Sequence, residues 1–246
     1  MNTSFHVSLD KDALYHNIEY LREYKQKELL PVIKANAYGH NSLLIAKALY
    51  DFNLKTWAVA RFSEAISITE YMINNFSIND FKILVFESLN DDYSFLEKYP
   101  QICPTINSIK DLKSALANNI PIDRLSLKID FGFGRNGVKE EEVDELKNLI
   151  KFNSLKFLSI FSHLFSASYT DGLEVIRKFT EVVNKLGRNN FQMIHLQNAA
   201  GIYNYDVEVV THIRTGMLTY GLQEAGFYDL DLKPVFYRTY WLCRFC

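Results

Sequence analysis

The sequence predicts an α/β fold, and within that class a (β/α)8 barrel of the TIM type. Short apolar stretches typical of buried strands alternate with stretches of helical periodicity along most of the 246 residues. Such alternation favours a parallel sheet, and about eight strand–helix units in a chain of this length favour a closed barrel over an open sheet. Polar residues follow nearly all of the apolar stretches, as expected of a barrel with a functional mouth.

The strand candidates come after an amphipathic segment, residues 10–24, in which Leu14, Ile18 and Leu21 recur at helical spacing. The first strand candidate is residues 30–34, an apolar run that ends at Lys34. The others, in chain order, are residues 56–61, 81–87, 102–106, 125–130, 155–163, 192–198 and 211–214. Their short, nearly continuous apolar character is typical of parallel strands that are buried on both faces.

Segments of helical periodicity separate these strands. They are residues 41–50, 63–72, 108–118, 140–152 and 173–186. We expect Ser63 to be the N-cap of the second segment, with Glu64 in its first turn, because hydroxyl and carboxylate oxygens accept the free amides at a helix start. The chain length suits one large α/β domain.

Composition and charge exclude several classes of protein. The chain is 48% hydrophobic and 23% charged with a net charge of −2, which gives no reason to expect a nucleic acid or an anionic membrane as partner. The N-terminus lacks the apolar core of a signal peptide, so we expect a cytoplasmic protein. Cys103, Cys243 and Cys246 are too few for a disulfide framework, and no second pair completes a zinc set, so we predict no metal.

Polar residues at the ends of the strand candidates define the predicted active face. In chain order they are Lys34, Arg61, Glu87, Asn107, Asp130, His163, Asn198 and Arg214. The carboxyl ends of barrel strands meet at one mouth, where such folds carry out their chemistry. Lys34 is the most informative of these residues, because a partly desolvated amine can form a Schiff base.

Two further features favour a ligand at this mouth. Gly216 follows the last strand candidate, where barrels often bind phosphate through loop amides that a glycine lets approach closely. Tyr38 offers a hydroxyl to the same mouth, and Gly39 lets the chain turn. Taken singly, these features also fit an ordinary surface lysine and an ordinary turn glycine.

The motif Lys-Ala-Asn-Ala-Tyr-Gly-His at residues 34–40, together with residues 214–221, resembles the pyridoxal-phosphate barrel domain of bacterial alanine racemases. Further blocks follow in matching order: residues 8–14 with Asn17, 57–60 with 63–65, 128–137, 161–164 and 195–201. The resemblance covers roughly residues 5–235. It implies a barrel that binds pyridoxal 5'-phosphate.

The resemblance implies how that cofactor is held. Lys34 would form the Schiff base with it and would also serve as one of two proton-transfer bases. The phosphate would lie against Tyr38, Asn198 and the backbone amides of Gly216 and Met217. Ala199 stands where the family has a phosphate-binding serine, which removes one hydrogen bond worth on the order of 1 kcal/mol.

The resemblance also assigns the residues around the cofactor ring. His163 would lie beside the ring, and Arg214 would face the ring nitrogen with His195 behind it. An arginine only donates, so the nitrogen would stay unprotonated and the ring would be a weaker electron sink. Arg135 would help to hold the substrate carboxylate or the phenolate side of the cofactor, and Lys128 matches a position that is carbamylated in some members.

The implied activity is interconversion of L-alanine and D-alanine, which supplies precursors of cell-wall peptidoglycan, by a homodimer. In the family, a tyrosine from the C-terminal β domain of the partner subunit supplies the second base. The family pattern ends near residue 235 here. We therefore expect residues 1–235 to form the barrel domain, residues 5–9 to be a strand belonging with the missing domain, and residues 236–246 to be its truncated remnant.

These expectations leave the activity of the chain open. Loss of a catalytic acid or base typically costs about 10²–10⁴-fold in rate, so we expect the chain alone to bind the cofactor but to racemise poorly. Three alternatives remain. They are a racemase or decarboxylase of the same barrel class for another amino acid, a single-domain pyridoxal-phosphate carrier without racemase activity, and a fragment that folds poorly because barrel surface is uncovered.

Overall fold

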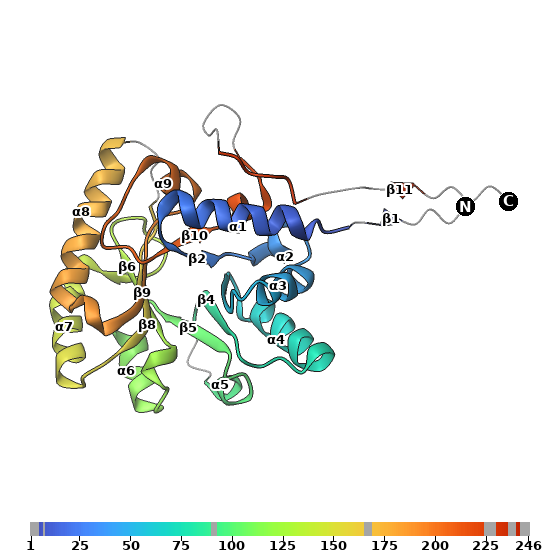
Figure 1. The fold of residues 1–246 in the computed structure, drawn as a ribbon. Coiled ribbons are helices and arrows are strands. Elements are labelled where there is room, and N and C mark those ends of the chain that lie inside the picture. Colours follow the sequence, from blue (N-terminus) through green and yellow to red (C-terminus); the bar gives the residue numbers. More distant parts are fainter. Residues whose placement is uncertain are drawn as a thin grey trace.

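The structure, a computed structural model, describes residues 5–6, 8–89, 93–164, 169–223, 230–235 and 240–241. Within these ranges, parallel strands form the centre and helices surround them (Figure 1). The central strands are β2 (Glu28–Pro31), β3 (Thr56–Val59), β4 (Lys82–Ser88), β5 (Ile102–Ile106), β6 (Ser126–Asp130), β8 (Phe157–Phe161), β9 (Phe191–His195) and β10 (His212–Thr215). Each lies within or beside a strand candidate of the sequence.

The strands close into a ring through two short seams. Strands β3, β4, β5, β6, β8 and β9 pair in that order, and β10 pairs with β2. At the first seam, Val32 bridges Ala58, whose carbonyl accepts the Ile33 amide at 2.8 Å. At the second, the Thr211 amide donates to the Ile194 carbonyl at 2.9 Å. The ring confirms the predicted (β/α)8 barrel.

The helices cover the outside of the barrel (Figure 1). The long ones are α1 (Lys11–Lys25), α3 (Ser42–Asp51), α4 (Phe62–Phe76), α6 (Ile109–Ala117), α7 (Val143–Phe152) and α8 (Tyr169–Leu186). The short elements are α2 (Lys34–Tyr38), α5 (Ser94–Lys98), α9 (Ala199–Asn204), β7 (Val138–Lys139) and the 3-10 turns η1 (Ile122–Arg124), η2 (Glu140–Glu142), η3 (Arg188–Asn190) and η4 (Met217–Tyr220). The long helices were predicted, whereas the short ones carry too few residues for a periodic pattern.

The start of α4 differs from the expectation. Arg61 is the N-cap residue, so the prediction of Ser63 was wrong. The carboxylate of Glu64 reaches back to accept the amides of Ala60 and Arg61 at 2.9 and 3.0 Å. The Glu64 carboxylate, rather than a serine hydroxyl, therefore accepts backbone amides at the start of this helix.

The core has two layers. One cluster fills the barrel interior with side chains such as Leu30, Ala58 and Met193, and the other packs the sheet against the helices. Cys103 belongs to the interior cluster, and burial raises the pKa of its thiol to about 11. A thiol in that state is a packing group rather than a nucleophile. Cys243 and Cys246 lie outside the described residues.

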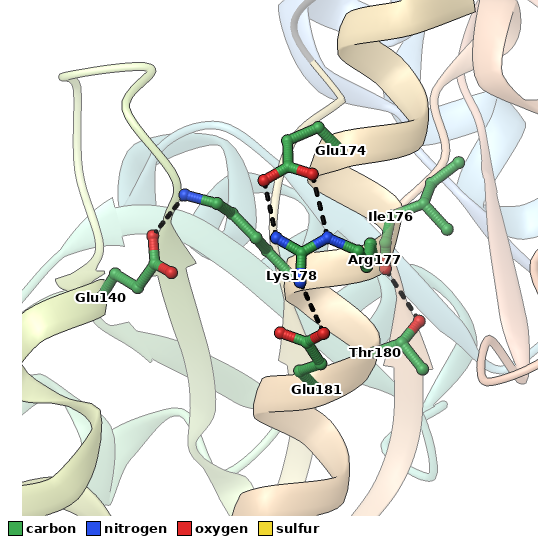
Figure 2. Close-up of polar contacts among 7 residues, drawn as sticks. All are labelled: Glu140, Glu174, Ile176, Arg177, Lys178, Thr180 and Glu181. Atoms are coloured by element: carbon green, nitrogen blue, oxygen red, sulfur yellow. Dashed lines mark hydrogen bonds and ion pairs between the residues drawn. The ribbon is translucent and has the colours of Figure 1, made fainter.

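Helix α8 carries an ion-pair network on its exposed face (Figure 2). The guanidinium of Arg177 donates to Glu174 at 2.7 and 2.9 Å and to Glu181 at 2.6 Å. Lys178 reaches Glu140 of η2 at 2.8 Å. Exposed pairs of this kind contribute about 1 kcal/mol or less each, so the helix is anchored mainly by apolar side chains such as the fully buried Phe179.

Residues 230–235 pack back onto the first helix. The side-chain amide of Asn17 donates to the carbonyl oxygens of Thr219 and Lys233 at 3.2 and 2.7 Å. The Asp10 amide donates to the Val235 carbonyl at 3.2 Å. The barrel therefore binds the chain up to residue 235 by hydrogen bonds from α1.

A separate two-stranded ribbon lies away from the barrel (Figure 1). Strand β1 (Phe5–His6) pairs antiparallel with β11 (Tyr240–Trp241). Residues 5 and 6 are thus extended as expected, and the domain to which they belong stays a prediction. In the described part of the chain, no helix is both long and apolar enough to cross a membrane.

Candidate active site

A cavity of about 970 Å³ opens where the carboxyl ends of the strands meet. Its volume suits a small-molecule ligand or cofactor. From the predicted polar ring, its lining includes Lys34, Arg61, Glu87, His163, Asn198 and Arg214. The residues added by the resemblance, Tyr38, Lys128, Arg135, Gly216 and Met217, line it as well.

Two residues of the predicted ring do not line the cavity. Asn107 turns to Ser88, to whose hydroxyl its side-chain amide donates at 2.8 Å. The carboxylate of Asp130 accepts the amides of Phe133 and Gly134 at 3.0 and 2.9 Å, and so shapes the loop between β6 and β7. The Asn107 side chain thus binds the end of β4, and the Asp130 side chain binds its own loop.

Lys34 begins a left-handed helical turn. Residues 35–38 have φ values between 51° and 54°, and Gly39 follows at 89°. A left-handed conformation costs a non-glycine residue about 1–2 kcal/mol, so four in succession need support from their surroundings. Strain of this kind is typical of functional sites, where it fixes a side chain in one position.

Hydrogen bonds within the motif support this turn. The Ala37 amide donates to the Ile33 carbonyl at 3.0 Å, and the Gly39 amide to the Ala35 carbonyl at 3.1 Å. The Nδ1 atom of His40 lies 3.0 Å from the carbonyl oxygen of Ala37, to which it donates. Burial lowers the pKa of His40, which keeps the ring neutral in this role.

Tyr38 and Gly216 meet at one side of the cavity. A Cβ atom on Gly216 would lie 2.6 Å from the Tyr38 hydroxyl oxygen, so this approach requires a glycine. The Lys34 amine lies 5.9 Å from the centre of the Tyr38 ring. Burial raises the pKa of Tyr38, so its hydroxyl is a neutral donor at physiological pH. The motif at residues 34–40 and the loop after β10 thus form one continuous wall.

Arg214 and His195 fix each other beneath the cavity. Arg214 donates to Nδ1 of His195 at 3.0 Å and to the Leu196 carbonyl at 2.7 Å. Because arginine only donates, Nδ1 of His195 must be the acceptor and Nε2 must carry the proton. Nε2 lies 3.2 Å from Ser159 Oγ, to which it donates. Burial holds the pKa of His195 well below its usual value and lowers that of Arg214 to about 10. Arg214 therefore remains a buried cation beside a neutral imidazole.

Phe161 forms the floor between these groups and the cavity. Its ring stacks on His195 with centres 4.8 Å apart, and the Arg214 guanidinium lies 5.7 Å from its centre. Phe86 also lines the cavity, with its ring 5.5 Å from that of Phe161. The sequence analysis placed both residues in strands without a site role, although an inward register in a barrel strand was an available signal.

Asn198 and its neighbour complete the wall opposite Lys34. The Asn198 side chain accepts the Gly201 amide at 3.0 Å as the N-cap of α9, and it donates to the Leu164 carbonyl at 2.9 Å. The side chain thus holds α9 and the loop after β8 in place. Ala199 also lines the cavity and offers no hydroxyl there.

Cationic side chains dominate the lining. Lys34, Lys128, Arg135 and Arg214 all border the cavity. Burial lowers the pKa of Lys128 to about 8, and its amine donates to the Asn136 carbonyl. In the described residues, no cluster of three or more histidine, cysteine or acidic side chains is placed to hold a metal ion. The lining favours an anionic ligand.

We predict that the free energy of unfolding falls as the pH falls from about 6.5 towards 4. Burial, followed by the charges of Arg214 and Arg135, lowers the pKa of His163 from 6.5 to about 4. Across this window the unfolded histidine binds a proton that the native one does not, so acid favours the unfolded state. His195, His40 and His212 shift in the same direction. Urea denaturation at pH 7 and pH 5 measures the effect.

The His163→Gln variant provides the control for this pH dependence. It removes one of the histidines whose pKa is lowered, so its loss of stability between pH 7 and pH 5 should be smaller than that of the unmodified chain. An equal loss in both proteins would show that His163 does not contribute to the pH dependence.

The family model described as the alanine racemase N-terminal domain matches residues 9–224. The alanine racemase of Fusobacterium nucleatum is 32% identical over 225 residues, which are 87% of this chain and 60% of that protein. The alanine racemase of Aquifex aeolicus is 29% identical over 231 residues, which are 93% of this chain and 62% of that protein. The chain thus spans about 60% of the length of these curated relatives.

Solved structures show the same fold. The alanine racemase of E. faecalis matches 94% of this chain over 64% of its own chain, with a TM-score of 0.77 at 25% identity. The alanine racemase of Bartonella henselae was solved with covalently bound pyridoxal phosphate. It matches 95% of this chain over 68% of its own chain, with a TM-score of 0.77 at 23% identity.

Proposed function

Since the chain belongs to the alanine racemase family, whose N-terminal domain it contains, we propose that it binds pyridoxal 5'-phosphate on Lys34 and acts in the racemisation of alanine. One observation carries the proposal. A single cavity brings together the Lys34 amine, the Gly216–Tyr38 wall and the buried cation Arg214. An amine for the Schiff base, polar groups for the phosphate and a side chain that faces the ring nitrogen are what this cofactor requires of its site.

The residues present fit the cofactor. Because Gly216 has no Cβ, the Tyr38 hydroxyl can pack directly against the loop after β10, where a Cβ would lie 2.6 Å from its oxygen. We propose that this hydroxyl and the amides of Gly216 and Met217 hold the phosphate, while Asn198 fixes the adjoining loop. The cationic lining adds attraction for the phosphate and for a substrate carboxylate.

When bound, pyridoxal phosphate supplies an electron sink that acidifies the Cα hydrogen of an attached amino acid. The amine of Lys34 would hold the cofactor and would move a proton on one face of that carbon. Arg214, which is hydrogen-bonded to His195, would offer the ring nitrogen a donor that retains its proton. His163 stays neutral at physiological pH because its pKa is near 4. Arg135 would bind the substrate carboxylate, with Lys128 behind it.

We propose that the second proton-transfer group comes from outside the barrel mouth. In the family that the chain resembles, a tyrosine of the partner subunit fills this role, which supports a homodimer as the working form. Residues 1–235 would be the barrel domain, with residues 5–9 and 236–246 belonging to a second domain. The 246 residues alone would then racemise alanine slowly, at about 10²–10⁴-fold below a complete enzyme.

The proposal is tested by adding pyridoxal phosphate to the purified chain, reducing with borohydride and mapping the adduct by mass spectrometry. The expected result is a visible Schiff-base absorbance band and one adduct, at Lys34. An unmodified Lys34 would contradict cofactor binding. D-alanine formation measured in parallel at ordinary enzyme rates would contradict the external second base, and an adduct without turnover would favour a cofactor carrier.

A further inference from the structure

The carboxylate of Glu64 connects the turn after Lys34 to the end of β3. One oxygen accepts the Ala35 amide at 2.6 Å, and the other accepts the amides of Ala60 and Arg61 at 2.9 and 3.0 Å. We infer that Glu64 is a positioning residue that holds the Lys34 amine at the barrel mouth. This inference rests on the proposed role of Lys34.

The Ala35 amide needs an acceptor from outside its own turn. It is the first amide after Lys34, and the bonds within the turn are donated by later residues, Ala37 and Gly39. The first amides of any helical turn point away from its carbonyl groups and need another partner. Glu64, which lies 29 residues along the chain, meets this need.

The backbone is anchored on both sides of Lys34. Before it, the Ile33 amide donates to the Ala58 carbonyl of β3 at 2.8 Å. After it, the Ala35 amide donates to Glu64, which also binds the end of β3. A change in the backbone torsions between these two anchors would redirect the Cα–Cβ bond of Lys34, so the anchors together fix where its side chain begins. Loss of the Glu64 contact would leave the backbone anchored to β3 only before Lys34.

A glutamine at position 64 separates positioning from helix capping. A carboxamide offers one acceptor oxygen, and its nitrogen only donates. The oxygen is expected to face the two amides of Ala60 and Arg61, because that arrangement satisfies more donors. The amide nitrogen then faces the Ala35 amide, where two donors meet. The Glu64→Gln variant therefore keeps the cap of α4 and frees the turn.

Asp111 provides the matched control. It lies in the first turn of α6, and its carboxylate accepts the Asn107 amide at 3.0 Å. The Asp111→Asn variant makes the same carboxylate-to-amide change at the start of another barrel helix, far in sequence from Lys34. Neither Asp111 nor Asn107 lines the cavity described here.

The first experiment is amide hydrogen exchange on the cofactor-free proteins. In Glu64→Gln, residues 35–39 should exchange about tenfold faster, since a hydrogen bond of ordinary strength is lost, while residues 60–65 stay unchanged. In Asp111→Asn, residues 35–39 should exchange as in the unmodified chain. Equal exchange of residues 35–39 in the Glu64→Gln variant and the unmodified chain would overturn the inference.

The second experiment measures the rate of adduct formation on Lys34 with pyridoxal phosphate. Glu64→Gln should form the adduct about tenfold more slowly, whereas Asp111→Asn should match the unmodified chain. Faster exchange combined with an unchanged adduct rate would overturn positioning of the amine. If the unmodified chain forms no adduct, the proposed function fails instead, and hydrogen exchange alone then decides whether Glu64 holds the turn.

Discussion

Replacing Lys34 with alanine is expected to abolish the covalent attachment of pyridoxal phosphate and to lower any alanine racemisation by about 10²–10⁴-fold or more. The variant removes both the amine that would bind the cofactor and the base for one face of the substrate. Absorbance spectra with added cofactor and borohydride trapping measure the first effect. A D-alanine assay measures the second.

Lys128 is the matched control for this prediction. Its amine borders the same cavity, and burial lowers its pKa to about 8, which makes it the competing nucleophile. Its amine is committed to the Asn136 carbonyl, so we expect Lys128→Ala to retain the adduct on Lys34. An adduct that survives in Lys34→Ala and disappears in Lys128→Ala would reverse the assignment.

The Gly216→Ala variant should weaken the binding of pyridoxal phosphate by about 10- to 100-fold. The new Cβ would lie 2.6 Å from the Tyr38 hydroxyl oxygen, which is closer than two such atoms approach, so the wall of the cavity must shift. Overpacking of a tight contact typically costs about 1–3 kcal/mol, which corresponds to this range of affinity. Titration followed by absorbance or tryptophan fluorescence measures the dissociation constant.

A double variant shows whether the contact itself is responsible. In Tyr38→Phe the hydroxyl is absent, so adding Gly216→Ala should cost less than it does in the unmodified chain. The relief should be partial, because the ring carbon that bears the hydroxyl would still lie 3.2 Å from the new Cβ. Unchanged affinity in Gly216→Ala would contradict a phosphate site at this wall.

The sequence was sufficient to predict the barrel, and most of the polar residues at the strand ends line one cavity, because both patterns depend on local residue order. It was not sufficient to tell which polar residue faces the cavity. Asn107 and Asp130 occupy strand ends like the others, but they bind Ser88 and the amides of their own loops. That choice depends on loop geometry, which strand periodicity does not encode.

The left-handed turn at residues 35–38 was the feature that could least be predicted from the sequence. Alanine favours the right-handed helix, so only Asn36 and Gly39 suggest another conformation. The turn depends on partners elsewhere in the chain, above all the Glu64 carboxylate. In the same way, the tautomer of His195, with Nδ1 as the acceptor, follows from Arg214, which lies 19 residues away. Such tertiary partners are invisible to a residue-by-residue pattern.

The seam between β10 and β2 joins the last barrel strand to the first, with Lys34 beyond one strand and Gly216 beyond the other. A growing chain therefore has no complete site until its last barrel strand leaves the ribosome and docks beside the first. A ligand that spans the seam binds only the closed barrel, and at 100 times its dissociation constant it stabilises that state by about 2.7 kcal/mol.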